Sequence, residues 1–264
     1  MHMRHAPAIL IILLLLPLVG GGLAAPCAAL AADEPGKTDL IMFIANADVP
    51  PYFMEEPEHQ GSGILVDVLK AVIEPLDYTF TIKRLPDKRG WHMLENGGVD
   101  VYASAPEWVS HPDRFLWTDP FMINEDVLLY PAESTLRYAR PEDLYGRTVA
   151  GIKGFAYPAL EPHFGPGKVS RLNATSPDAM LKLLLFGRAD AVLVNRTEIL
   201  WMFRNRKDLR PQQFRLDETP VERAYYRFLF SRNRGWEPVL EQFNRRLETM
   251  KQDGSLEAVL DQYR

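Results

Sequence analysis

The sequence contains one pattern twice, about ninety residues apart: a helix-like run that ends at glycine and leads into a short acidic-apolar strand. The first copy covers residues 91–103 and the second covers residues 180–194. Each copy predicts a helix closed by a glycine, followed by a buried strand of a parallel sheet. Two such units indicate two similar α/β lobes with a cleft between them.

The first 31 residues have the pattern of a signal peptide. Arg4 supplies a positive start, an apolar run covers residues 8–19, and Ala29 and Ala31 place small residues where a signal peptidase reads them. The alternative is a membrane anchor, but the run is shorter than the ~20 residues that cross a bilayer. Lipid anchoring at Cys27 is a second alternative, which the preceding Pro26 disfavours. We expect a periplasmic protein.

Cysteine and charge limit the classes of function that the mature chain can have. Cys27 is the only cysteine, so cleavage after residue 31 leaves no thiol and no disulfide. The whole chain has 30 Lys and Arg against 35 Asp and Glu, for a net charge of −5. The basic residues are dispersed among acidic ones, and this argues against a nucleic-acid partner.

The order of elements predicts how the two lobes are built. A buried strand at 40–45, a helix at 64–76 and a strand at 78–83 form a β-α-β unit, which predicts a parallel pair of strands. Strand-like runs at 126–130 and 225–230 are interpreted as two connecting strands. The predicted lobes and hinges are then placed as follows: lobe 1 at 38–125 plus 226–264, lobe 2 at 126–225, and hinge strands near 126–131 and 224–230.

Collinear short motifs over nearly the whole mature chain carry a family resemblance. The chain resembles the bacterial extracellular solute-binding proteins of family 3, which serve polar amino-acid ABC importers. The motifs are residues 50–52, Gly63 with Asp67, 97–100, 112–114, 119–121, 142–149, 187–191, 243–244, Met250, 253–254 and 260–263. The resemblance implies a type II periplasmic-binding-protein fold, in which two α/β lobes with mostly parallel sheets and flanking helices are joined by two crossing strands.

The resemblance also implies where a ligand would bind in lobe 1. In such proteins an arginine of a Thr-x-x-Arg loop often holds a ligand carboxylate, and Arg114 occupies that position. A guanidinium can grip a carboxylate with two parallel hydrogen bonds. The alternative is a surface arginine paired with Asp113 or Asp119. Tyr52 is expected in the cleft wall, because its loop follows the first strand.

Departures from the family pattern bear on the identity of the ligand. Family members usually place an aspartate at the position of Asn195, where it meets the ligand ammonium. An amide cannot neutralise a buried cation, so a standard α-amino acid is disfavoured. Phe155 and Tyr157 lie in a lobe 2 loop that lacks the usual hydroxyl residue, and they are further candidates for ligand contact.

Two unusual segments of lobe 1 add candidate residues. Arg89, at the start of a helix, suggests an anionic ligand, although an exposed basic turn is an equal alternative. Glu107 could pair with Arg89 or Arg114, or receive a ligand amine. Trp108 could stack on the ligand, and plain packing within the lobe is the alternative.

No catalytic motif is present, and the histidines are too scattered to predict a metal site. We therefore expect a monomeric binding protein without cofactor or metal, which captures a small polar, carboxylate-bearing ligand for an ABC permease by hinge closure. One alternative is a ligand-sensing receptor protein. Another is an enzyme similar to the family's dehydratases of arogenate or prephenate, with Glu107 as its acid.

Overall fold

The computed structural model describes residues 38–46, 48–56 and 59–264. The predicted signal peptide and Cys27 lie outside the described residues. Within the described part of the chain, no helix is long and apolar enough to cross a membrane.

The first part of the chain forms the predicted β-α-β unit. Strand β1 (Thr38–Ala45) leads through the short hairpin β2 (Met54–Glu56) and β3 (His59–Ser62) to helix α1 (Ile64–Ile73). Strand β4 (Tyr78–Leu85) then pairs with β1 in parallel, as the sequence predicted. Seven apolar side chains of α1 are buried, and six of them recur at the spacing of one helix face.

Both copies of the repeated pattern fold into a helix followed by a strand. In the first, α2 (Asp87–Glu95) precedes β5 (Val101–Ser104); in the second, α3 (Pro177–Leu185) precedes β10 (Ala191–Asn195). Gly97 and Gly187 have positive φ angles of 75° and 64°. Glycine adopts this left-handed conformation without steric cost, so it can end the helix and turn the chain into the strand.

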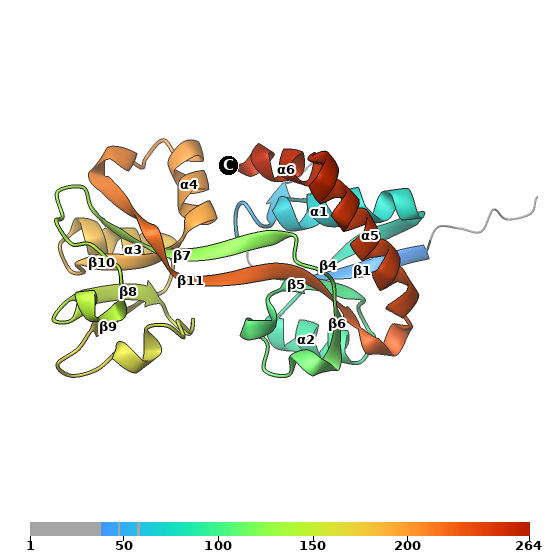
Figure 1. Cartoon of the computed structure of the whole chain (residues 1–264), viewed down its shortest axis with the longest axis horizontal. Coiled ribbons are helices and arrows are strands. Elements are labelled where there is room, and N and C mark those ends of the chain that lie inside the picture. The colour runs from blue at the N-terminus through green and yellow to red at the C-terminus, as the bar shows by residue number, and fades with distance from the viewer. Residues whose placement is uncertain (1–37, 47, 57–58) are drawn as a thin grey trace, which may run out of the picture. The chain divides into compact units, whose positions relative to one another are not determined.

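Strand order explains how the two α/β regions are connected. The path runs β4-β1-β5-β11-β7-β10-β8-β9, with β6 (Phe115–Trp117) attached to β11 (Phe214–Ser231). Strands β8 (Thr148–Ile152), β9 (Ser170–Ala174) and β10 pair in parallel. Strand β7 (Met122–Pro131) runs antiparallel beside the long β11 (Figure 1). These two strands cross between the parallel regions, as the fold class requires.

Four apolar clusters form the core, and each draws on one of the two regions. Two contain residues from 40–122 and 226–263, and the other two contain residues from 127–221. Helix α4 (Arg196–Asn205) packs in the second region. The tail helices α5 (Glu237–Asp253) and α6 (Ser255–Leu260) pack beside α1 in the first (Figure 1). The exact lobe boundaries stay a prediction.

Candidate functional site

A polar cluster centred on Asn195 joins three parts of the chain that are distant in sequence. Asn195 ends β10 and caps α4, because its side-chain oxygen accepts a hydrogen bond of 3.0 Å from the backbone N–H of Glu198. The Tyr52 hydroxyl, from the loop after β1, donates to the same oxygen at 2.7 Å. The Asn195 amide donates to the side-chain oxygen of Asn124 on β7 at 2.6 Å.

Strand register places two carboxyl groups beside this cluster. Asp126 on β7 lies opposite Asn195 of β10 on one side and opposite Glu222 of β11 on the other. Directly opposed residues in an antiparallel pair project to the same face of the sheet. Asn195, Asp126 and Glu222 therefore form a row across three strands, and Asn124 lies on the same face because it is two residues from Asp126.

Burial makes ionisation of these carboxyl groups costly. It raises the pKa of Asp126 to about 6, although hydrogen bonds with Asn195 and Asn124 act in the opposite direction. Burial, followed by the nearby charge of Asp126, raises the pKa of Glu198 to about 7. The pKa of Glu222 is raised by burial and by the charges of Asp126 and Glu107. A cationic group placed here would favour the charged forms of all three.

Aromatic rings form a wall next to the polar cluster. The ring of Tyr52 is buried, and its centroid lies 5.2 Å from that of Tyr226 on β11. The ring of Trp108 meets Tyr226 edge to face, also at 5.2 Å. Trp108 lies in the turn after β5 (Pro106–Trp108) and is 43% exposed, so much of its indole surface is free to contact a ligand.

Arg114 and Trp108 both contribute to the lining of a small pocket. Arg114 belongs to a short turn (Pro112–Arg114), is exposed, and forms an ion pair with Glu95 at the end of α2. Glu95 is a partner that the sequence did not suggest. The pocket has a volume of about 250 Å³, and Trp91, Trp108, His111 and Arg114 contribute to its lining. Trp108 thus connects the arginine to the aromatic wall.

The remaining predicted site residues lie at different depths. Arg89 and Glu107 are exposed, and Glu107 lies near enough to Glu222 to influence its pKa. Phe155, after β8, is 61% exposed. Tyr157 is buried and has a structural contact, because its hydroxyl accepts a hydrogen bond of 3.0 Å from the backbone N–H of Ile152. Burial raises its pKa to about 12.

Sequence reasoning found part of this arrangement and missed five residues. Tyr52 and Asn195 are in direct contact, and Trp108 reaches them through Tyr226. The missed residues are Asn124, Asp126, Glu198, Glu222 and Tyr226. Asp126 and Tyr226 stand inside the predicted connecting strands, so a search for polar or aromatic residues in those strands would have found them. Among the described residues, no group of His, Cys, Asp and Glu could hold a metal ion.

This arrangement, with two α/β regions joined by a pair of crossing strands, defines the class of two-lobed, type II periplasmic binding proteins. The sequence model of the bacterial extracellular solute-binding proteins, family 3, matches residues 41–264. The chain belongs to this family.

Solved structures of the same class share the fold. The GluR0 ligand-binding core in complex with L-glutamate has 18% identity and a TM-score of 0.66. The alignment covers 86% of this chain and 98% of the GluR0 chain. The second substrate-binding domain of the GlnP protein of Lactococcus lactis, in an open conformation, has 18% identity and a TM-score of 0.66, over 87% and 96%.

A third structure is the second substrate-binding domain of a putative amino acid ABC transporter from Streptococcus pneumoniae. It has 17% identity and a TM-score of 0.66, over 85% of this chain and 99% of its own. No curated protein matches the sequence. The family and these structures consist of binding proteins rather than enzymes.

Proposed function

We propose that the protein is an exported, monomeric solute-binding protein of the periplasm. It captures a small polar ligand that carries a carboxylate, an amino acid or a related organic acid, and delivers it to the permease of an ABC importer. The observation that supports this most directly is the polar cluster of Tyr52, Asn124 and Asn195. It joins the loop after β1 to β7, β10 and the start of α4.

The charges around the cluster favour a ligand that also carries an ammonium group. Asp126 and Glu198 have raised pKa values from burial. An ammonium near them would replace part of the lost hydration and stabilise their ionised forms. In this proposal Asp126, one strand away, supplies the negative charge that Asn195 lacks. The sequence-based objection to an amino acid is thereby weakened.

The other parts of the ligand are assigned to the aromatic and basic residues. The Arg114 guanidinium receives the carboxylate in exchange for Glu95, and Arg89 adds positive charge. Trp108 and Tyr52 form apolar walls, and Asn195 supplies a polar contact. Glu107, Phe155 and Tyr157 complete the proposed set from the two loops. The GluR0 core in complex with L-glutamate and an ancestral arginine-binding protein bound to glutamine support an amino-acid-like ligand.

Binding is coupled to bending of the two crossing strands. A ligand that contacts residues on both sides of β7 and β11 stabilises the closed arrangement, because only that arrangement makes both sets of contacts. The same closure would serve a sensor, which presents the closed form to a membrane receptor. Delivery to a permease is preferred because similar structures include domains of amino acid ABC transporters.

Isothermal titration calorimetry with matched ligands tests the assignment. The best α-amino acid from a thermal-shift screen is compared with the 2-hydroxy acid that lacks its ammonium and with the amine that lacks its carboxylate. We expect the intact protein to bind the amino acid more tightly than either the hydroxy acid or the amine. Asp126→Asn lowers the affinity for the amino acid by about tenfold or more, because one charge-assisted contact is lost. The affinity for the hydroxy acid, which has no ammonium, changes little.

Arg114→Gln weakens both carboxylate-bearing ligands, whereas Arg188→Gln removes an exposed arginine elsewhere and serves as the matched control. A hydroxy acid that binds the intact protein as tightly as the amino acid contradicts the proposed ammonium site. Unchanged affinity in Arg114→Gln contradicts the proposed carboxylate site.

A further inference from the structure

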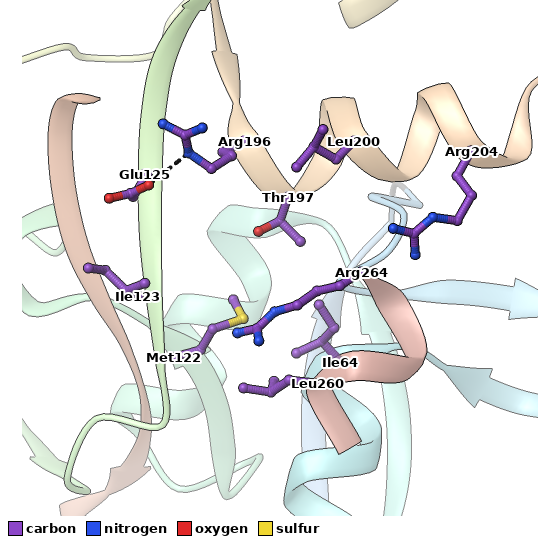
Figure 2. Close-up of a pocket in the computed structure, with 10 residues that line it drawn as sticks. All are labelled: Ile64, Met122, Ile123, Glu125, Arg196, Thr197, Leu200, Arg204, Leu260 and Arg264. Atoms are coloured by element: carbon purple, nitrogen blue, oxygen red, sulfur yellow. Dashed lines mark hydrogen bonds and ion pairs between the residues drawn. The ribbon is translucent and has the colours of Figure 1, made fainter. Parts of the chain in front are cut away.

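A separate pocket lies between α4 and α6, with β7 at its side (Figure 2). Its volume is about 330 Å³, near the lower end of the ~300–1,000 Å³ typical of sites for small molecules. Ile123 and Glu125 of β7 contribute to its lining. Because side chains alternate along a strand, these two residues face away from Asn124 and Asp126. The pocket therefore opens on the other face of β7 from the polar cluster, and it adjoins that cluster at Met122, which lies opposite Tyr226, and at Thr197.

Arginines dominate the polar lining of this pocket. Arg196 and Arg204 lie on one face of α4, eight residues apart, and Arg264 follows α6. Figure 2 shows the side chain of Arg204 reaching down from α4 and that of Arg264 extending across the pocket toward Met122. Since Glu125 is the one acid among the described residues of the lining, this part of the pocket wall carries an excess of positive charge.

The ion pairs leave this excess only partly compensated. Glu125 accepts from both Arg196 and Arg223, each at 2.8 Å, so two guanidinium groups share one carboxylate. Arg264 is paired with Glu257 and Asp261 outside the pocket lining. Arg204 is exposed, and in the described part of the chain no acid is paired with it. Its guanidinium is therefore available to an incoming anion.

Apart from Thr197, the rest of the lining is apolar and comes from both core regions. Ile64 and Leu260 belong to the cluster around α1, and Leu200 belongs to α4. Leu200 is 43% exposed, so its side chain presents apolar surface to the pocket. Burial of such surface stabilises a complex, because apolar area is removed from water. A ligand with an alkyl group fits this lining better than a purely polar ion does.

We propose that this pocket is a second binding site, which takes a small organic anion made of a short alkyl chain and a carboxylate or phosphate head. The guanidinium of Arg204 binds the head group, because its planar N–H fork matches both kinds of oxyanion. The alkyl chain lies against Leu200, Ile64 and Leu260. An occupant of this kind contacts both core regions at once and so favours one bend of the crossing strands.

Calorimetry with hexanoate as the probe tests this site directly. Hexanoate is expected to bind saturably with one molecule per chain, butyl phosphate to bind as well, and hexylamine and acetate to bind much more weakly. Arg204→Gln should lower the affinity for hexanoate by about tenfold, because a charge-assisted contact is lost. Leu200→Ser should also lower this affinity. Arg188→Gln replaces an exposed arginine outside the pocket and should leave the affinity unchanged.

Three results would overturn the inference. One is the absence of saturable hexanoate binding, and another is equal binding of hexanoate and hexylamine. The third is hexanoate binding that Arg114→Gln removes and Arg204→Gln leaves intact, because the carboxylate would then occupy the proposed solute site. Because the probe is not the transported solute, this test can fail while the proposed function stands, and the reverse also holds.

Discussion

Substituting Asp126 by asparagine keeps the size of the side chain and removes its charge. Burial raises the pKa of Asp126 from the ordinary 3.8 to about 6 in the folded protein. At about 1.4 kcal/mol per pKa unit, the ionised carboxyl costs the ligand-free fold about 3 kcal/mol. The amide that replaces the carboxyl in Asp126→Asn does not ionise, so this cost disappears.

The sign of the pH dependence follows from the raised pKa. Between pH 4 and pH 6 the folded protein binds more protons at this carboxyl than the unfolded chain does. The free energy of unfolding therefore falls as the pH rises through this range. Near pH 4 the carboxyl is protonated in the folded protein and about half ionised in the unfolded chain, so the variant gains little. Above pH 7 the gain approaches its full size of about 3 kcal/mol.

Urea unfolding of the mature protein without ligand, followed by tryptophan fluorescence at several pH values from 4 to 8, measures this difference. Glu125→Gln is the matched control on the same strand. Although burial opposes ionisation of Glu125, hydrogen bonds from Arg223 and Arg196 hold its pKa below the ordinary value. Its substitution should therefore destabilise the protein most at neutral pH, where the native carboxylate is ionised.

The reasoning is refuted if Asp126→Asn and the native protein differ by the same amount at pH 4 and pH 8. It is also refuted if the variant is the less stable protein at pH 8. Either result would mean that Asp126 is well hydrated or is paired with a cation in the ligand-free fold.

Other substitutions test further parts of the structure, each by urea unfolding. Tyr52→Phe removes the 2.7 Å hydrogen bond to Asn195 and should cost about 1 kcal/mol; no loss would argue against this contact. Gly90→Ala places a Cβ 2.0 Å from the ring of Phe43 and should lower the free energy of unfolding by about 1–3 kcal/mol. An unchanged free energy of unfolding would show that the α2–β1 packing is looser than described. Ser176→Ala removes the N-cap of α3 and should cost about 1 kcal/mol, and Ser176→Gly should restore most of that; equal losses would contradict capping.

The sequence was a good guide to the fold because the relevant signals are local. The helix predicted at 64–76 corresponds to α1, and glycine marked the ends of α2 and α3. The β-α-β order and the two connecting strands then followed from general rules of topology. The family resemblance added the type II class, which the family match and the similar structures confirm.

The site was harder to predict because it depends on register between strands that are distant in sequence. Asn195 could be singled out by its position, yet nothing local shows that it lies opposite Asp126, 69 residues earlier in the chain. The partner of Arg114 raised the same difficulty. Glu95 belongs to α2, and only the packing of α2 beside the 112–114 turn brings the two charges together. The roles of all these residues in binding stay predictions.

Native mass spectrometry of the protein, purified without denaturation, tests the central claim most directly. The account predicts one small molecule bound per chain, and fragmentation of the released molecule should show both a carboxylate and an amino group. A bound molecule that lacks either group would contradict the proposed binding chemistry. A protein that carries no ligand and binds no member of a panel of amino acids and organic acids would contradict the proposed function itself.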